Sequence, residues 1–199
     1  MKRLVVLLLC GLGVCPIAGC PPRIDDLPAV EVIVDGGGQF PEDLAGVWKA
    51  DSGGWEIVVE PNGTISSAVV SLGRVRLKPG RKTVVPMKMG GKGVFRAGRW
   101  AVYYSHERRE LTVEITIESF RVELGESVVK GRTMDLFTGT ISPDGRSWWA
   151  SRFSFPQYVA DTKKYRDHKL VVDPNETPPE ELLFQKAPVP GRSDSGDSS

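Results

Sequence analysis

The cysteine side chains of this chain stand together near its beginning. The three cysteines are Cys10, Cys15 and Cys20. A thiolate is a strong nucleophile, and Cys20 follows two small residues, Ala18 and Gly19, which leave the backbone accessible to a peptidase. The residue types at this point therefore suit alkylation of the Cys20 thiol and cleavage of the backbone beside it.

The residues before Cys20 predict an export signal. Lys2 and Arg3 give a cationic start, and the apolar run 4–14 that follows is about half as long as the ~20 residues that a transmembrane helix needs. A short apolar run followed by small residues is typical of a secretory signal peptide, which we expect over 1–19. An uncleaved signal anchor is the alternative.

Ile17-Ala18-Gly19-Cys20 resembles the lipobox of bacterial lipoproteins, in which an aliphatic residue and two small residues precede a cysteine. The resemblance implies diacylglyceryl transfer to the Cys20 sulfur and cleavage between Gly19 and Cys20. It also implies acylation of the new amino group with a fatty acid such as palmitate. Two acyl chains hold a protein stably on a membrane. We therefore expect a lipid anchor on the extracytoplasmic side of a bacterial membrane, with an ordinary signal peptide and a coincidental cysteine as the alternative.

The chain beyond Cys20 offers little for catalysis or metal binding. It has no further cysteine, which excludes a disulfide within the domain and a thiolate zinc site, and the two histidines are His106 and His168. Asp51-Ser52-Gly53-Gly54 resembles the nucleophile segment of chymotrypsin-like proteases, but Ala50 stands where that family has glycine. We expect a glycine-rich turn there. The sequence predicts no enzyme, no metal and no cofactor.

Charge is balanced over the whole chain but segregated along it. The 26 Lys and Arg and 25 Asp and Glu give a net charge of +1, which indicates no nucleic-acid partner. Between Glu60 and Glu107 there is no acidic residue. A shared cationic face there would attract an anionic envelope component; pairing with acids on neighbouring strands is the alternative. The residues that would form this face are Arg74, Arg76, Lys78, Arg81 and Lys82.

Alternating apolar and polar residues predict β-strands from residue 46 to residue 155. Pro61-Asn62-Gly63 and Ser142-Pro143-Asp144-Gly145 are typical hairpin turns between such runs. The apolar positions move from odd to even numbers near Glu118-Ser119. A shift of one residue turns side chains to the other face of a sheet, so we expect a β-bulge there.

Many short strands joined by tight turns predict an all-β domain over 45–184. An antiparallel up-and-down meander closing into a small barrel removes the sheet edges, and a β-sandwich is the alternative. Gly46-Val47-Trp48 is similar to the opening motif of lipocalins. That resemblance implies a lipocalin-like barrel in which Trp48 plugs the closed end and Arg152 packs over it.

The segments that flank this domain have different compositions. Residues 20–44 contain prolines and the triplet Gly36-Gly37-Gly38, so we expect a flexible tether there, although 29–34 could form a strand. Residues 158–169 and 178–184 are expected to form short helices, the second with acids in its first turn. The polar stretch 185–199 is expected to be a disordered tail.

Together these features predict a membrane-anchored envelope lipoprotein with a non-catalytic β-domain. The expected role is binding of a small apolar or amphiphilic ligand. The alternatives are an interaction module for a protein or an envelope polymer, which would use the basic face, and an envelope hydrolase. A ligand carrier needs an internal cavity, whereas a solid core containing Trp48, Trp100 and Trp149 would favour an interaction module.

Overall fold

The computed structural model of the 199-residue chain describes residues 28–70, 74–87, 90–161, 168–171 and 178–187. Within these ranges the one helical element is a 3-10 turn, η2 (Glu42–Leu44). All other regular elements are strands. They are β1 (Val30–Asp35), β2 (Gly46–Ala50), β3 (Glu56–Val59), β4 (Ile65–Val70), β5 (Val75–Leu77), β6 (Lys82–Pro86), β7 (Lys92–Ala97), β8 (Trp100–Ser105), β9 (Glu110–Leu124), β10 (Ser127–Ile141), β11 (Ser147–Ser154), β12 (Gln157–Asp161), β13 (His168–Val171) and β14 (Glu180–Lys186).

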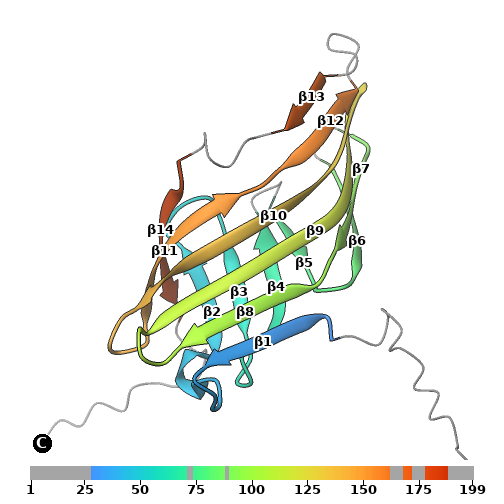
Figure 1. Ribbon diagram of the computed structural model, residues 1–199. Coiled ribbons are helices and arrows are strands. Elements are labelled where there is room, and N and C mark those ends of the chain that lie inside the picture. Colours follow the sequence, from blue (N-terminus) through green and yellow to red (C-terminus); the bar gives the residue numbers. More distant parts are fainter. Residues whose placement is uncertain (1–27, 71–73, 88–89, 162–167, 172–177, 188–199) are drawn as a thin grey trace, which may run out of the picture.

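The strands form one sheet of 14 strands, which confirms the all-β prediction. Its main path runs β1-β8-β9-β10-β11-β14-β2-β3-β4-β5. The sheet is mixed, because β1 pairs with β8 in parallel while the other described pairs are antiparallel. The path curls, so that β2 to β5 lie behind β8, β9 and β10 in Figure 1.

The predicted closed up-and-down barrel is wrong. The main path ends at β1 on one side and at β5 on the other, and no strand pair in the described part of the chain joins them. The reason lies in the two longest strands. On one edge β9 pairs with β8 over its first half and with β7 over its second half. β10 divides in the same way between β11 and β12, so the sheet branches instead of forming a single ring.

The predicted β-bulge is confirmed, and it lies where the sheet branches. Arg96 is opposite Ser119 whereas the next residue, Ala97, is opposite Ile117, so Glu118 is the extra residue. The pairing of β9 with β10 shifts at the same level, between Gly131 and Thr133. A bulge bends its strand and increases the local twist, which allows one half of β9 to pair with β8 and the other half with β7.

Large aromatic side chains fill the space enclosed by the curled sheet. Trp48 on β2 meets Trp148 on β11 edge to face, with ring centroids 6.4 Å apart. Trp148 also stacks on Phe184 of β14 at 4.8 Å, and Phe184 contacts Phe137 of β10 at 5.7 Å. Each such pair adds about 0.5–1.5 kcal/mol to the gain from burial. The core is therefore solid around Trp48.

Trp149, the neighbour of Trp148 on β11, does not belong to this core. Trp148 is 1% exposed, whereas Trp149 is 54% exposed. Successive side chains of a strand point to opposite faces, and the alternation places Trp148 and Ala150 on the buried face of β11. Two adjacent tryptophans fit either phase, so the strand pattern alone did not decide which of them is buried.

The expected tether contributes to the fold. Residues 30–35 form β1, and Phe40 and Leu44 are buried in the core. The alternation of Val30, Val32 and Val34, which pack against the core, makes this segment a strand. The tether expected over 20–44 is thus wrong for its second half, while residues 20–27 lie outside the described part.

Both expected helices are also corrected. The first range contains β12 and β13, which pair with each other. The second is β14, which pairs with β11 and β2. In β14 the buried residues Leu182 and Phe184 alternate with the exposed Glu181 and Gln185. The backbone pairing of β14 with a strand on each edge outweighs the local preference for a helix that the acidic residues at its start indicated. β14 also continues past residue 184, and 188–199 of the expected tail lie outside the described residues.

Candidate functional site

The inner face of the sheet, beside the aromatic core, holds a pocket of about 210 Å³. Its floor comes from β10 and β11, in which Asp135 is opposite Ser154. Trp55 lies just before β3, and Pro156 and Tyr158 lie at the entry to β12. Apolar and polar side chains share the lining, which consists of Trp55, Val70, Phe120, Thr133, Asp135, Arg152, Ser154, Pro156 and Tyr158.

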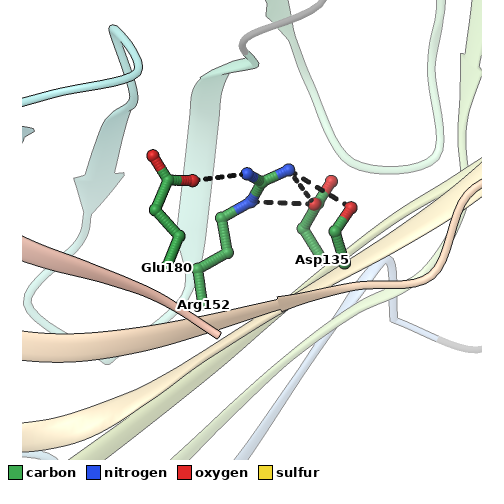
Figure 2. Close-up of polar contacts among 4 residues, drawn as sticks. Asp135, Arg152 and Glu180 are labelled. Atoms are coloured by element: carbon green, nitrogen blue, oxygen red, sulfur yellow. Dashed lines mark hydrogen bonds and ion pairs between the residues drawn. The ribbon is translucent and has the colours of Figure 1, made fainter. Parts of the chain in front are cut away.

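Arg152 is the centre of the polar groups, as Figure 2 shows. Its Nε and Nη2 donate hydrogen bonds to Asp135 Oδ1 at 3.0 and 2.7 Å. Its Nη1 donates to Glu180 Oε2 at 2.7 Å, and Nη2 also donates to Ser154 Oγ at 3.2 Å. Three strands, β10, β11 and β14, are therefore joined through one guanidinium.

The polar network around Arg152 includes a buried carboxylate. Asp135 is 3% exposed, so its charge needs a partner on the inner face. The guanidinium of Arg152 also lies 4.8 Å from the ring centroid of Trp55, which is a cation–π contact. Arg152 is thus held by two carboxylates, a hydroxyl and an indole face. We infer that its orientation is fixed before any ligand enters.

Two side chains that line the pocket have hydrogen-bonding capacity that the contacts described above do not use. Both Arg152 hydrogen bonds to Asp135 end on Oδ1, so Arg152 does not use Oδ2. The indole Nε1 of Trp55 is buried without an acceptor in the described part of the chain. One arginine and two carboxylates also give the group a formal charge of −1. The site therefore favours a neutral or cationic ligand that donates a hydrogen bond to Asp135.

The residues of the lipocalin-like motif are placed differently from the prediction. Trp48 is fully buried, and its Nε1 donates to Leu44 O at 2.9 Å. Arg152 lies over Trp55, and Lys186 Nζ is the cation near the Trp48 ring, at 6.0 Å. Gly46 has a φ of 141° and faces the Lys186 side chain. The predicted packing of Arg152 over Trp48 is therefore wrong.

The predicted basic residues are all exposed. Arg76 on β5 bonds to Glu56 on β3 and to Ser67 on β4. This ion pair reaches across β4, because Glu56 and Arg76 are both opposite Val69. The remaining four make no ion pair with a described residue. They are Arg74, Lys78, Arg81 and Lys82, of which only Lys82 lies on β6.

The other chemical candidates take structural positions. Asp51-Ser52-Gly53-Gly54 is a turn, as expected, in which Asp51 Oδ1 accepts a hydrogen bond from Leu183 N at 3.1 Å. His106 is exposed, lies 3.2 Å from Gln39 O and meets the Tyr104 ring edge to face. His168 begins β13. No group of three or more metal-binding side chains is arranged to hold an ion within the described ranges.

Arg152 was predicted from the sequence as a site residue, whereas Asp135 and Glu180 were not. A signal for Asp135 exists in the strand Thr133 to Phe137, because the buried phase of β10 places the aspartate between two inward-facing residues. A charged residue in a buried phase indicates a partner on the same face. Glu180 gave no such signal, because its segment was expected to be a helix.

Gly19 and Cys20 lie outside the described residues. No described helix is long and apolar enough to cross a membrane. In the comparisons with known proteins, no family model, no curated protein and no solved structure matches this chain.

Proposed function

We propose that this chain is a lipid-anchored envelope protein whose domain binds a small amphiphilic ligand in the Arg152 pocket without catalysing a reaction. The observation that carries the binding role is a charged group fixed on the inner face beside open, partly aromatic space. The motif ending at Cys20 supports the anchor. A lipocalin-like carrier of bulky apolar ligands is disfavoured, because the core around Trp48 and Trp148 is filled.

The size and charge of the pocket define the ligand class. A cavity of about 150 Å³ is large enough for benzene, so about 210 Å³ accommodates one aromatic ring with a short polar arm. The ring would contact Phe120 and Tyr158. The arm would donate a hydrogen bond to Asp135 Oδ2, because Arg152 does not use that oxygen. A carboxylate arm would be repelled by the negative formal charge of the group formed by Arg152, Asp135 and Glu180.

Three probes of the same size test this proposal by isothermal titration calorimetry. They are 2-phenylethylamine, 2-phenylethanol and phenylacetate, which differ in the charge of the arm. We expect the amine to bind most tightly, with a Kd on the order of 1 mM or lower, and phenylacetate to bind most weakly. Failure of all three to bind, or tightest binding of phenylacetate, would contradict the proposal.

Two variants locate the binding site. Asp135→Asn keeps the shape of the side chain and should remove most of the preference for the amine over the alcohol. Tyr158→Ala leaves the ion pairs in place and should weaken all three probes by several-fold. Glu181→Gln is the matched control, since Glu181 is exposed and bonds to Ser151 outside the pocket. Equal effects of Asp135→Asn and Glu181→Gln would place binding elsewhere.

A further inference from the structure

The outer face of the branched half of the sheet carries cations that are opposite one another. Lys82 on β6 is opposite Arg96 on β7, and Arg121 on β9 is opposite Lys130 on β10. All four side chains are exposed. Like charges directly opposite on neighbouring strands are destabilising. Two such pairs on one face indicate that their charge serves something other than stability.

Aliphatic side chains lie in the same register row as Arg121 and Lys130. Val84 is opposite Val94, Val94 is opposite Arg121, and Lys130 is opposite Val159. Val84 is 56% exposed and Val159 is 42% exposed. We call this surface the basic strip, and Figure 1 shows its strands along the right and upper parts of the sheet. It consists of Lys82, Val84, Val94, Arg96, Arg121, Lys130, Arg132 and Val159.

The strip is only partly neutralised. Arg121 pairs with Glu123 at 3.4 Å, and Arg132 donates to the uncharged Gln157 at 2.9 Å. Lys82, Arg96 and Lys130 make no ion pair with any described residue. Glu118, the extra residue of the bulge, lies beside Lys130 and Arg132 in the lining of a groove of about 520 Å³. The groove gives an anionic group access to both cations.

We propose that the basic strip docks the domain on an anionic phospholipid surface. Cations close to such a surface each strengthen binding about fivefold. Exposed valines among the cations suit a bilayer, because they can enter the headgroup boundary while the cations meet phosphates. A soluble polyanion would bind the cations but would leave the valines in water. None of the eight residues of the strip lines the Arg152 pocket, so the two proposals can fail separately.

The experiment uses vesicle flotation with the full chain carrying Cys20→Ser, so that no lipid anchor contributes. Vesicles contain phosphatidylcholine alone or with about one quarter phosphatidylglycerol. The leader is common to all variants, so only the difference between vesicle types and between variants is interpreted. We expect at least tenfold tighter binding to the anionic vesicles.

Matched triple variants separate the strip from net charge. Lys82→Gln, Arg96→Gln and Lys130→Gln together should reduce binding to anionic vesicles at least tenfold. The control combines Arg74→Gln, Lys78→Gln and Arg146→Gln, which remove the same charge from exposed positions outside the strip and should reduce binding less than threefold. Equal losses in the two triple variants, or no preference for anionic vesicles, would overturn the proposal.

The valines distinguish a membrane from a soluble polyanion. Val84→Ser with Val159→Ser keeps every charge and should weaken vesicle binding several-fold while leaving retention on dextran sulfate unchanged. Both side chains are exposed, so the fold should tolerate the change. Unchanged vesicle binding by this variant would favour an anionic polymer and overturn the membrane proposal.

Discussion

Two arginines of this domain meet carboxylates in opposite surroundings. Arg152 lies on the inner face, where its partner Asp135 is nearly inaccessible to solvent. Arg76 lies on the outer face with a side chain that is 48% exposed, and its partner Glu56 is 20% exposed. Removing one member of a buried pair leaves an uncompensated charge, whereas exposed pairs contribute about 0–1 kcal/mol. The Arg152 group is therefore the one that the fold depends on more strongly.

The exposed pair predicts a pH dependence. The hydrogen bond from Arg76 lowers the pKa of Glu56 below its usual value of 4.5; burial opposes this, and the charges of Arg76 and Lys49 add to it. A lowered pKa means that the carboxylate stabilises the fold above pH ~5 and that this contribution is lost as the pH falls through 4.5 and below. Glu56→Gln should therefore be less stable than the wild type by about 0.5–1 kcal/mol at neutral pH.

Urea unfolding at neutral pH and at about pH 3 measures this effect. The difference between the wild type and Glu56→Gln should shrink at the lower pH, because the wild-type carboxylate becomes protonated. Arg76→Gln should show the same trend, and adding Glu56→Gln to it should cost little more. A difference that grows as the pH falls would show that another group controls it.

At the scale of elements, β11 connects the aromatic core to the Arg152 pocket. Its inward residues include Trp148 in the core and Arg152 in the pocket, while Trp149 and Phe153 point outward. β14 lies against β11 over six register positions and supplies Glu180 to the pocket and Phe184 to the core. A strand from the end of the domain thus completes both the aromatic core and the ion-pair network.

The alternation of β11 gives a paired prediction from two neighbouring tryptophans. Trp148→Ala removes a buried ring that contacts Trp48, Phe137 and Phe184, and it should destabilise the domain by about 3–5 kcal/mol. Trp149→Ala removes an exposed ring and should cost less than about 1 kcal/mol. Chemical unfolding followed by circular dichroism compares the two. Equal losses would contradict this assignment, and a larger loss in Trp149→Ala would show that the strand has the opposite phase.

For the whole molecule, local patterns predicted the strands but not their arrangement. The alternation of polar and apolar residues located the bulge at Glu118-Ser119, and the turn residues located the hairpins before β4 and after β10. It could not show that β1 pairs in parallel with β8, because that contact joins segments about 70 residues apart. The branching of β9 and β10 has the same origin. A closed ring was the simplest arrangement that would protect the sheet edges. The long-range strand pairs instead produce an open, branched sheet.

The candidate site was predictable only in part for the same reason. Arg152 was singled out because the lipocalin resemblance implied that it packs over Trp48. That contact was predicted wrongly, since the ring beneath Arg152 is Trp55. Its partners come from β10 and β14, and the second of these had been assigned to a helix. A network built across three strands becomes visible only when their register is known. Sequence alone therefore located one member of the site.

The proposed anchor determines where the molecule works and can be tested without reference to the folded domain. Cys20→Ser removes the thiol that would accept the lipid, so the protein should move from the membrane to the soluble fraction of cells that express it. Cys15→Ser is the matched control, because it removes a leader cysteine that lies outside the Ile17-Ala18-Gly19-Cys20 motif. It should leave the protein on the membrane.

Since two acyl chains give stable attachment, washing with concentrated salt should release neither the wild type nor Cys15→Ser. Persistence of Cys20→Ser on the membrane after the same wash would contradict the lipid anchor. Its release by salt alone would instead point to electrostatic attachment through the basic strip.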